Sequence, residues 1–139
     1  MERSEFLKYM GTGTLMACAG CSLLSCESND DPTPTPITGL DFTLDLTLPA
    51  NSALLNVGGS LSKNGIIIAK ISTSEFTAVS SACTHAGTDI NYRSTPQDFR
   101  CPNHGSVFDK NGAVKNGPAT KALAKYNTEL TGNNLRVFS

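Results

Sequence analysis

Histidine is nearly absent from this sequence, and this scarcity makes its placement informative. The 139 residues contain two histidines, His85 and His104, and each lies just downstream of a cysteine, Cys83 or Cys101. The other three of the five cysteines fall within the first 26 residues. A scaffold of two disulfides is therefore excluded for the rest of the chain, and a single Cys83–Cys101 bridge would leave the paired histidines unexplained.

The sequence also lacks an excess of basic residues and a long apolar run. Its 11 Lys and Arg against 12 Asp and Glu give a formal net charge of -1, which argues against a nucleic-acid partner. Residues 10–24 carry no charge, but this stretch is shorter than the roughly 20 apolar residues that cross a bilayer as a helix. A charged start, a short apolar core and small residues before a cysteine instead predict an export signal over residues 1–25.

The end of this segment resembles a bacterial lipoprotein signal, in which a Leu-x-small-Cys box is cleaved before the cysteine and the cysteine is lipidated. Cys26, which ends the sequence LLSC, fits the box best, and Cys18 and Cys21 are weaker candidates. Acyl chains on Cys26 would hold the protein at a membrane surface without spanning the bilayer. The resemblance implies an extracytoplasmic, membrane-anchored lipoprotein, on the periplasmic side of the inner membrane or on the outer membrane.

Residues 26–38 predict a solvated tether. They combine acidic residues with prolines that alternate with threonine, and this composition favours an extended chain over a packed element. The remaining residues, 39–139, form one folded domain. The sequence RSEFLK at residues 3–8 resembles the twin-arginine signal of proteins exported in folded form, but Ser4 replaces the second arginine, which leaves the export route open.

The folded part has the period of β-strands and shows no convincing helix. In residues 41–48 the apolar side chains Phe42, Leu44, Leu46 and Leu48 lie on one side of the predicted strand, which Pro49 ends. The β-branched run at residues 66–71 suits a central strand, and another strand is expected at residues 76–79. Asn-Gly and Gly-Asn pairs at residues 64–65, 111–112 and 132–133 predict tight turns between strands. The fold class is therefore all-β with antiparallel strands.

The two Cys–His pairs predict a metal site. Thiolate and imidazole are both strong ligands for borderline metals, and two segments that each offer one sulfur and one nitrogen supply four ligands. Zinc could take this set tetrahedrally, although zinc fingers usually pair cysteine with cysteine and histidine with histidine on separate segments. An iron–sulfur centre in which one iron takes both cysteines and the other iron both histidines requires the mixed arrangement seen here.

The sequences around these pairs resemble the two cluster-binding loops of the Rieske iron–sulfur family. CTHAG at residues 83–87 is similar to the first loop, and CPNHGS at residues 101–106 is similar to the second. Downstream, FD at residues 108–109, GAV at 112–114 and GPA at 117–119 resemble the strand, turn and proline loop that cover the cluster in that family. The resemblance extends over roughly residues 79–137.

The resemblance implies one Rieske-type 2Fe-2S cluster per chain, held by a small cluster-binding subdomain of two loops on an antiparallel β sandwich. Cys83 and Cys101 would bind one iron, and His85 and His104 the other. Two more residues are expected at the cluster. Ser106 would give a hydrogen bond to a bridging sulfide, and Pro118 would shield the cluster.

The sequence departs from the quinol-oxidising members of the family at three positions. In those members each loop carries an extra cysteine, and the two cysteines form a disulfide. Thr88 and Asn103 occupy these positions here, so that bridge cannot form. Phe108 replaces a tyrosine whose hydroxyl bonds a ligand sulfur in those members.

We expect one-electron transfer, because no free cysteine, spare histidine or paired carboxylate lies near the Cys–His segments to form an independent active site. The expected redox partner is a protein donor or acceptor, such as a cytochrome or a quinone-linked complex. Two alternatives stay open at this point. The domain could be the Rieske subunit of a multi-component oxidoreductase, of the quinol–cytochrome or arsenite-oxidase-like kind, or a structural zinc module that binds another protein.

Overall fold

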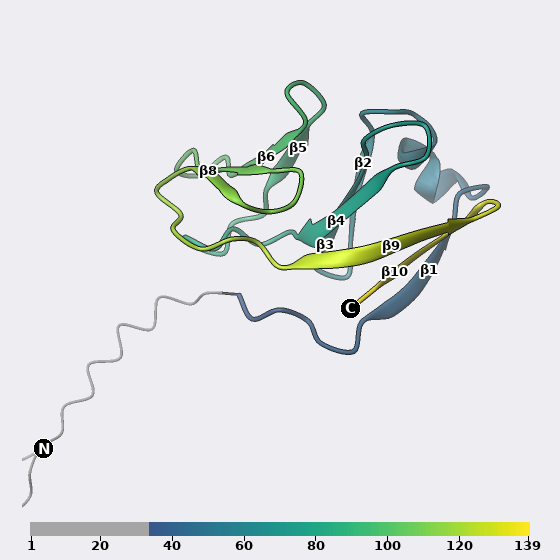
Figure 1. Cartoon of the computed structure of the whole chain (residues 1–139), viewed down its shortest axis with the longest axis horizontal. Coiled ribbons are helices and arrows are strands. Elements are labelled where there is room, and N and C mark those ends of the chain that lie inside the picture. The colour runs from purple at the N-terminus through teal and green to yellow at the C-terminus, as the bar shows by residue number, and fades with distance from the viewer. Residues whose placement is uncertain (1–33) are drawn as a thin grey trace, which may run out of the picture.

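The computed structural model describes residues 34–139. The expected export signal, the cysteine expected to be lipidated, Cys26, and most of the tether lie outside the described residues. Among residues 34–139 no helix is long and apolar enough to cross a membrane. Within this range the chain forms ten strands and one short 3-10 helix (Figure 1): β1 (Asp41–Asp45), η1 (Pro49–Leu55), β2 (Ser60–Lys63), β3 (Ile66–Lys70), β4 (Phe76–Ser80), β5 (Asn91–Arg93), β6 (Asp98–Arg100), β7 (Val107–Asp109), β8 (Val114–Asn116), β9 (Lys125–Thr131) and β10 (Asn134–Phe138).

The strands form two antiparallel sheets. The larger has six strands in the order β1-β10-β9-β4-β3-β2, and the smaller has four in the order β5-β6-β7-β8. In Figure 1 the smaller sheet lies at one end of the larger one, on the side away from η1. The expected all-β antiparallel fold is therefore confirmed.

Strand β3 shows how the two sheets share the core. Ile66 and Ile68 belong to one hydrophobic cluster, whereas Ile67 and Ala69 belong to the other. Because successive side chains of a strand point to opposite faces, a strand covered on both faces is apolar at every position. This explains why the β-branched run is uninterrupted by polar residues.

One hydrophobic cluster lies inside the larger sheet. Its members come from β1, β9 and β10 on one side and from β3 and β4 on the other, and η1 adds Leu54. The buried residues of this cluster are Leu44, Leu46, Leu54, Ile66, Ile68, Phe76, Ala78, Tyr126, Leu135 and Val137.

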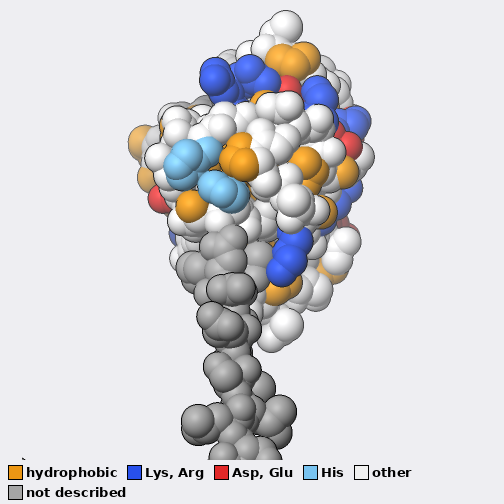
Figure 2. Space-filling view, turned by 90° about the vertical axis from the view of Figure 1, so that its left-hand side faces the viewer, with side chains coloured by type: hydrophobic (Ala, Val, Ile, Leu, Met, Phe, Trp, Pro, Cys, Tyr) orange, Lys and Arg blue, Asp and Glu red, His pale blue; other side chains and the backbone are white. Residues whose placement is uncertain are grey.

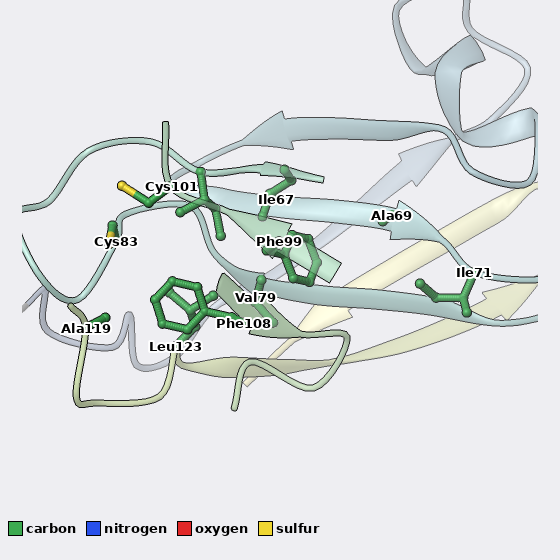
Figure 3. Packing of buried hydrophobic residues seen from close by; sticks show 11 residues of the cluster. Ile67, Ala69, Ile71, Val79, Cys83, Phe99, Cys101, Phe108, Ala119 and Leu123 are labelled. Carbon is green, nitrogen blue, oxygen red and sulfur yellow. The ribbon is translucent and has the colours of Figure 1, made fainter. Parts of the chain in front are cut away.

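The other hydrophobic cluster joins the larger sheet to the smaller one and ends at the two cysteines. Phe99 and Phe108 are fully buried in it. Figure 3 shows the Phe99 ring beside Ile67 and Val79, and the Phe108 ring nearer the end where Cys83 and Cys101 lie. The buried residues of this cluster are Ile67, Ala69, Ile71, Val79, Cys83, Ile90, Phe99, Cys101, Phe108, Ala119 and Leu123.

The predicted turns are present. Asn64 and Gly65 both have positive φ, 53° and 75°, and connect β2 to β3, as an Asn-Gly hairpin turn requires. The hairpins β7–β8 and β9–β10 also form where the sequence predicts them.

The predicted strand at residues 41–48 is too long. β1 ends at Asp45, whose carboxylate accepts hydrogen bonds from the backbone N–H of Thr47 at 2.8 Å and from its hydroxyl at 2.6 Å. This local turn redirects the chain, so that Leu48 is 51% exposed and does not continue the buried side of the strand. Pro49 then begins the helix η1, which the sequence pattern does not predict.

Candidate metal centre

The first Cys–His loop, residues 83–88, connects β4 to β5 and folds back on its cysteine. The N–H of Cys83 donates to the carbonyl of Thr88 at 2.8 Å, and the N–H of Gly87 donates to the carbonyl of Cys83 at 2.8 Å. Gly87 has a φ of 71°, which residues with a side chain rarely adopt. An antiparallel bridge between Ala82 and Asp89 closes the base of the loop.

The second Cys–His loop, residues 101–106, connects β6 to β7 and has the same backbone pattern. The N–H of Cys101 donates to the carbonyl of Ser106 at 2.8 Å, and the N–H of Gly105 donates to the carbonyl of Cys101 at 3.1 Å. Gly105 has a φ of 80°. Arg100 and Val107 pair at the base of this loop, so both loops present a cysteine from the same backbone frame.

The two cysteines lie at the same end of the core. Cys83 and Cys101 are 0% and 1% exposed, and both are free thiols, so the alternative of a single bridge between them is not realised. Burial raises the pKa of the Cys83 thiol, with a further increase from the neighbouring Cys101, while hydrogen bonds from the backbone N–H groups of His85 and Ala86 act in the opposite direction. A buried thiolate requires a compensating positive charge, and a metal ion supplies one.

The two histidines lie against each other at the surface. Their rings meet edge to face, with the ring centroids of His85 and His104 4.8 Å apart at an interplanar angle of 89°. Figure 2 shows the two imidazoles side by side at the end of the molecule. His104 is exposed and His85 is half-buried. The Nδ1 atom of His85 is buried and has no hydrogen-bond partner in the protein.

A third segment, residues 117–123, braces both loops. The hydroxyl of Ser106, which is fully buried, accepts a hydrogen bond from the N–H of Ala119 at 3.0 Å. The hydroxyl of Thr84 donates to the carbonyl of Lys121 at 2.6 Å. Pro118, which is exposed, precedes Ala119 in this segment. The bond from Ala119 leaves the Ser106 hydroxyl free to donate its own proton.

Two features of this region are not predicted by the sequence pattern. Thr84 lies between a cysteine and a histidine that the pattern singles out, but its partner Lys121 is 37 residues away. Asp98 is only 1% exposed and forms a bidentate ion pair with Arg93, with its carboxylate oxygens 2.7 and 2.8 Å from Nε and Nη2, while Lys115 lies 3.4 Å away. Asp98 lies in β6, three residues before Cys101, so this ion pair fixes the strand from which the second loop extends.

The side chains assembled here fit an iron–sulfur group. The two buried sulfurs require a positive charge, and the unpartnered Nδ1 of His85 is a nitrogen donor that the protein itself does not satisfy. In the described range 34–139, no three His, Cys, Asp or Glu side chains are placed to hold a single metal ion. A two-iron cluster requires only two protein ligands on each iron.

Comparison with known proteins identifies the family of this metal-binding β domain. The family model described as the Rieske [2Fe-2S] domain matches residues 48–127. This chain therefore belongs to the Rieske family, and its cofactor is a 2Fe-2S cluster. Membership of the family also removes the alternative of a structural zinc module.

Individual relatives are similar over part of the chain. The cytochrome b6-f complex iron-sulfur subunit of Microcystis aeruginosa is 36% identical over 61 residues, which make up 44% of this chain and 34% of that protein. A corresponding subunit from Synechococcus sp. is 37% identical over 59 residues, 42% of this chain and 33% of that protein. The chain thus matches about a third of the length of these curated relatives.

Solved structures share the fold. The crystal structure of the cyanobacterial plasma membrane Rieske protein PetC3 from Synechocystis PCC 6803 is similar with a TM-score of 0.51 and 31% identity, covering 58% of this chain and 85% of that one. The ferredoxin of carbazole 1,9a-dioxygenase from Nocardioides aromaticivorans has a TM-score of 0.53 at 21% identity, covering 73% of this chain and 98% of that one. At that identity the second likeness concerns the fold alone.

Proposed function

We propose that this protein transfers single electrons through a Rieske cluster in which Cys83 and Cys101 bind one iron and His85 and His104 bind the other. The observation that carries this assignment is the shared backbone frame of the two loops. It brings two buried sulfurs to one end of the core and two imidazoles to the surface beyond them. When bound, such a cluster accepts and releases one electron at a time.

The proposed ligand set determines the reduction potential that is expected of the cluster. Two ferric ions, two sulfides, two thiolates and two neutral imidazoles carry no net charge in the oxidised state, whereas an all-cysteine set would be more negative and harder to reduce. The reduction potential is accordingly expected in the range of about -150 to +300 mV. The family's electron-transfer role agrees with this proposal.

The protein residues around the site have defined roles in this proposal. Ser106, held by Ala119, would donate a hydrogen bond from its hydroxyl to a sulfide of the bound cluster and would so favour the more negative, reduced state. The backbone N–H groups of His85 and Ala86 do the same at the Cys83 sulfur. Pro118, exposed beside Ala119, would shield the bound cluster from water, and the exposed edge of His104 would be the route by which an electron reaches a partner.

We further propose that the protein works at a membrane surface outside the cytoplasm, anchored by lipid on Cys26. The support is the lipoprotein-like signal over residues 1–25 and the acidic, proline-rich tether over residues 26–38. A radiolabelled fatty acid should be incorporated into the native protein and not into Cys26→Ser. Incorporation into both would move the anchor to Cys18 or Cys21, and incorporation into neither would reject the anchor.

A second candidate function is that of a Rieske subunit in a larger oxidoreductase. It is favoured by the curated relatives, which are subunits of the cytochrome b6-f complex. Co-purification of a cytochrome with the tagged, membrane-extracted chain would support this function. Isolation of the chain alone under mild extraction would support a freely docking carrier.

The proposed ligand set is tested on the full chain purified without air. We expect about two irons and two acid-labile sulfides per chain, and a reduced-state electron paramagnetic resonance spectrum with the g-values of histidine-ligated iron. Protein without iron and sulfide would reject the proposed function. A spectrum typical of all-cysteine ligation would reject the roles of His85 and His104.

A further inference from the structure

A pocket of about 350 Å³ lies at the foot of the second Cys–His loop. It is lined by Asn91, Arg93, Arg100 and Pro102. Asn91 and Arg100 are paired across β5 and β6, and Pro102 follows Cys101 directly. The pocket therefore adjoins the loop that carries His104, on the outer face of the small sheet.

The pocket is positively charged because both charged residues of its lining, Arg93 and Arg100, are basic. Arg93 uses Nε and Nη2 to bind the buried Asp98, and Lys115 shares the same carboxylate. Arg100 is exposed and forms no ion pair within residues 34–139 that the structure describes. Asp109 pairs with Asp98 across β6 and β7 and adds a second carboxylate to this face. The three basic side chains and the two carboxylates leave a local charge of +1, although the whole chain has a formal charge of -1.

This positive face is on the same side of the molecule as the exposed imidazoles. Figure 2 shows a group of Lys and Arg side chains above the two histidines, separated from them by uncharged side chains. A guanidinium binds carboxylates with a planar, two-pronged geometry, and the Asn91 amide adds a neutral donor. Opposite charge around an electron exit accelerates encounter with a redox partner and orients it.

We propose that the Asn91–Arg93–Arg100–Pro102 pocket is a docking site for carboxylate side chains on an acidic redox protein. The inference rests on the proposed electron-transfer function and names the chemistry of its partner. Arg100 is the principal contact, because Arg93 is largely engaged with Asp98. Docking at this pocket places the partner against His104, where the electron leaves.

Binding is tested on the full-chain holoprotein with a fluorescent hexaglutamate peptide as the acidic probe. At low ionic strength, Arg100→Gln should weaken peptide binding about fivefold, since one exposed charge-assisted contact is lost. Arg136→Gln makes the same change in net charge at an arginine paired with Asp41 on the larger sheet, and should leave the affinity unchanged. Equal effects of the two substitutions would overturn the proposal, as would displacement of the peptide by an equal concentration of inorganic phosphate.

Electron transfer gives an independent measurement. The reduced protein gives one electron to ferricyanide, which becomes ferrocyanide, or one electron to the cationic tris(phenanthroline)cobalt(III), which becomes the cobalt(II) complex. Arg100→Gln should slow the reaction with ferricyanide about fivefold at low ionic strength and should not slow that with the cobalt complex. A rate with ferricyanide equal to that of Arg136→Gln would contradict the docking site.

The two proposals fail separately. Iron content and the visible spectrum of each variant are measured first. If the cluster is present in Arg100→Gln and neither peptide binding nor the ferricyanide rate changes, the docking site is rejected while electron transfer stands. If the unsubstituted protein carries no cluster, the proposed function itself is rejected.

Discussion

The two Cys–His loops have the same backbone and different chemistry. In each, the cysteine N–H binds the carbonyl five residues later, and the glycine N–H four residues later binds the cysteine carbonyl. The histidine, however, is the second residue after Cys83 in one loop and the third after Cys101 in the other. His85 is therefore half-buried and His104 exposed. One backbone frame thus presents two imidazoles at different depths.

The last position of each loop differs in a similar way. Ser106 is fully buried and is bound by the N–H of Ala119. Thr88, at the equivalent position, is half-buried. The comparison indicates that the positions of the cysteines and carbonyls depend on the shared backbone, whereas the hydroxyl expected to tune the cofactor belongs to one loop alone.

The largest expected effect is the loss of the cluster when either histidine is substituted, which tests whether the two loops are equivalent as ligands. His85→Ala and His104→Ala should each abolish the cluster, because each removes one of the two proposed protein ligands of the same iron. Iron content and visible absorption of protein purified without air measure this loss. A cluster retained in either variant would show that the loops are not equivalent in ligation.

A large effect is also expected at the strand that carries the second loop. Burial opposes ionisation of Asp98, but hydrogen bonds from Arg93 and Lys115 outweigh it and hold the pKa of this carboxyl below its ordinary value of 3.8. Asp98→Asn should lower the free energy of unfolding by about 2 kcal/mol, as expected for one partner removed from a buried pair that is partly exposed on its basic side. Denaturant unfolding measures this difference.

The same ion pair predicts an acid dependence. Since the folded-state pKa of Asp98 is lowered, its contribution is fully present above the ordinary carboxyl pKa and is lost as the pH falls through the lower, folded-state pKa. The difference in stability between the native protein and Asp98→Asn should therefore shrink below about pH 4. A difference that stays constant down to pH 2 would show that packing alone causes it.

A smaller effect should be the same in both loops. Gly87→Ala and Gly105→Ala each place a Cβ where no protein atom beyond the chain neighbours lies within 4 Å, so the cost within the protein comes from positive φ. We expect each substitution to destabilise the protein by about 1 kcal/mol. Unequal unfolding free energies of the two variants would mean that the bound cofactor fills the space beside only one glycine.

The smallest expected effect distinguishes the loops. Ser106→Ala should lower the reduction potential by about 40 mV, which corresponds to one hydrogen bond of about 1 kcal/mol lost from the reduced state. Thr88→Ala is the matched control and should leave the potential unchanged. Protein-film voltammetry measures both, and equal shifts would mean that Ser106 acts only as a residue of the turn.

The sequence predicts the parts of this molecule that depend on neighbouring residues. The Asn64–Gly65 turn and the fully apolar β3 follow from local geometry and from burial on both faces. Strands β5 and β6 do not, because three residues each are too short to show a period. The packing of their connecting turn depends on distant contacts, such as the hydrogen bond from the Gln97 amide to the carbonyl of Ile71.

The same limit applies to the site. The four expected ligands are recognisable because their residue types are rare and closely spaced, and the structure brings all four to one end of the core. Thr84 is not recognisable, because its role depends on Lys121, which lies far along the chain. Asp98 is not recognisable either, because its main partner, Arg93, faces it across two strands that are too short to show a period. The ligand roles themselves stay a prediction until the cofactor is measured.

The brace formed by residues 117–123 bears on the conditions in which the protein can work. It fastens the loops through the hydroxyls of Thr84 and Ser106, and the thiols among residues 34–139 are Cys83 and Cys101, both free. No sulfur–sulfur bond in this part of the chain can be opened by a reductant. Reductants therefore have no covalent link between the two loops to break, and dithiothreitol should leave the fold around the site intact.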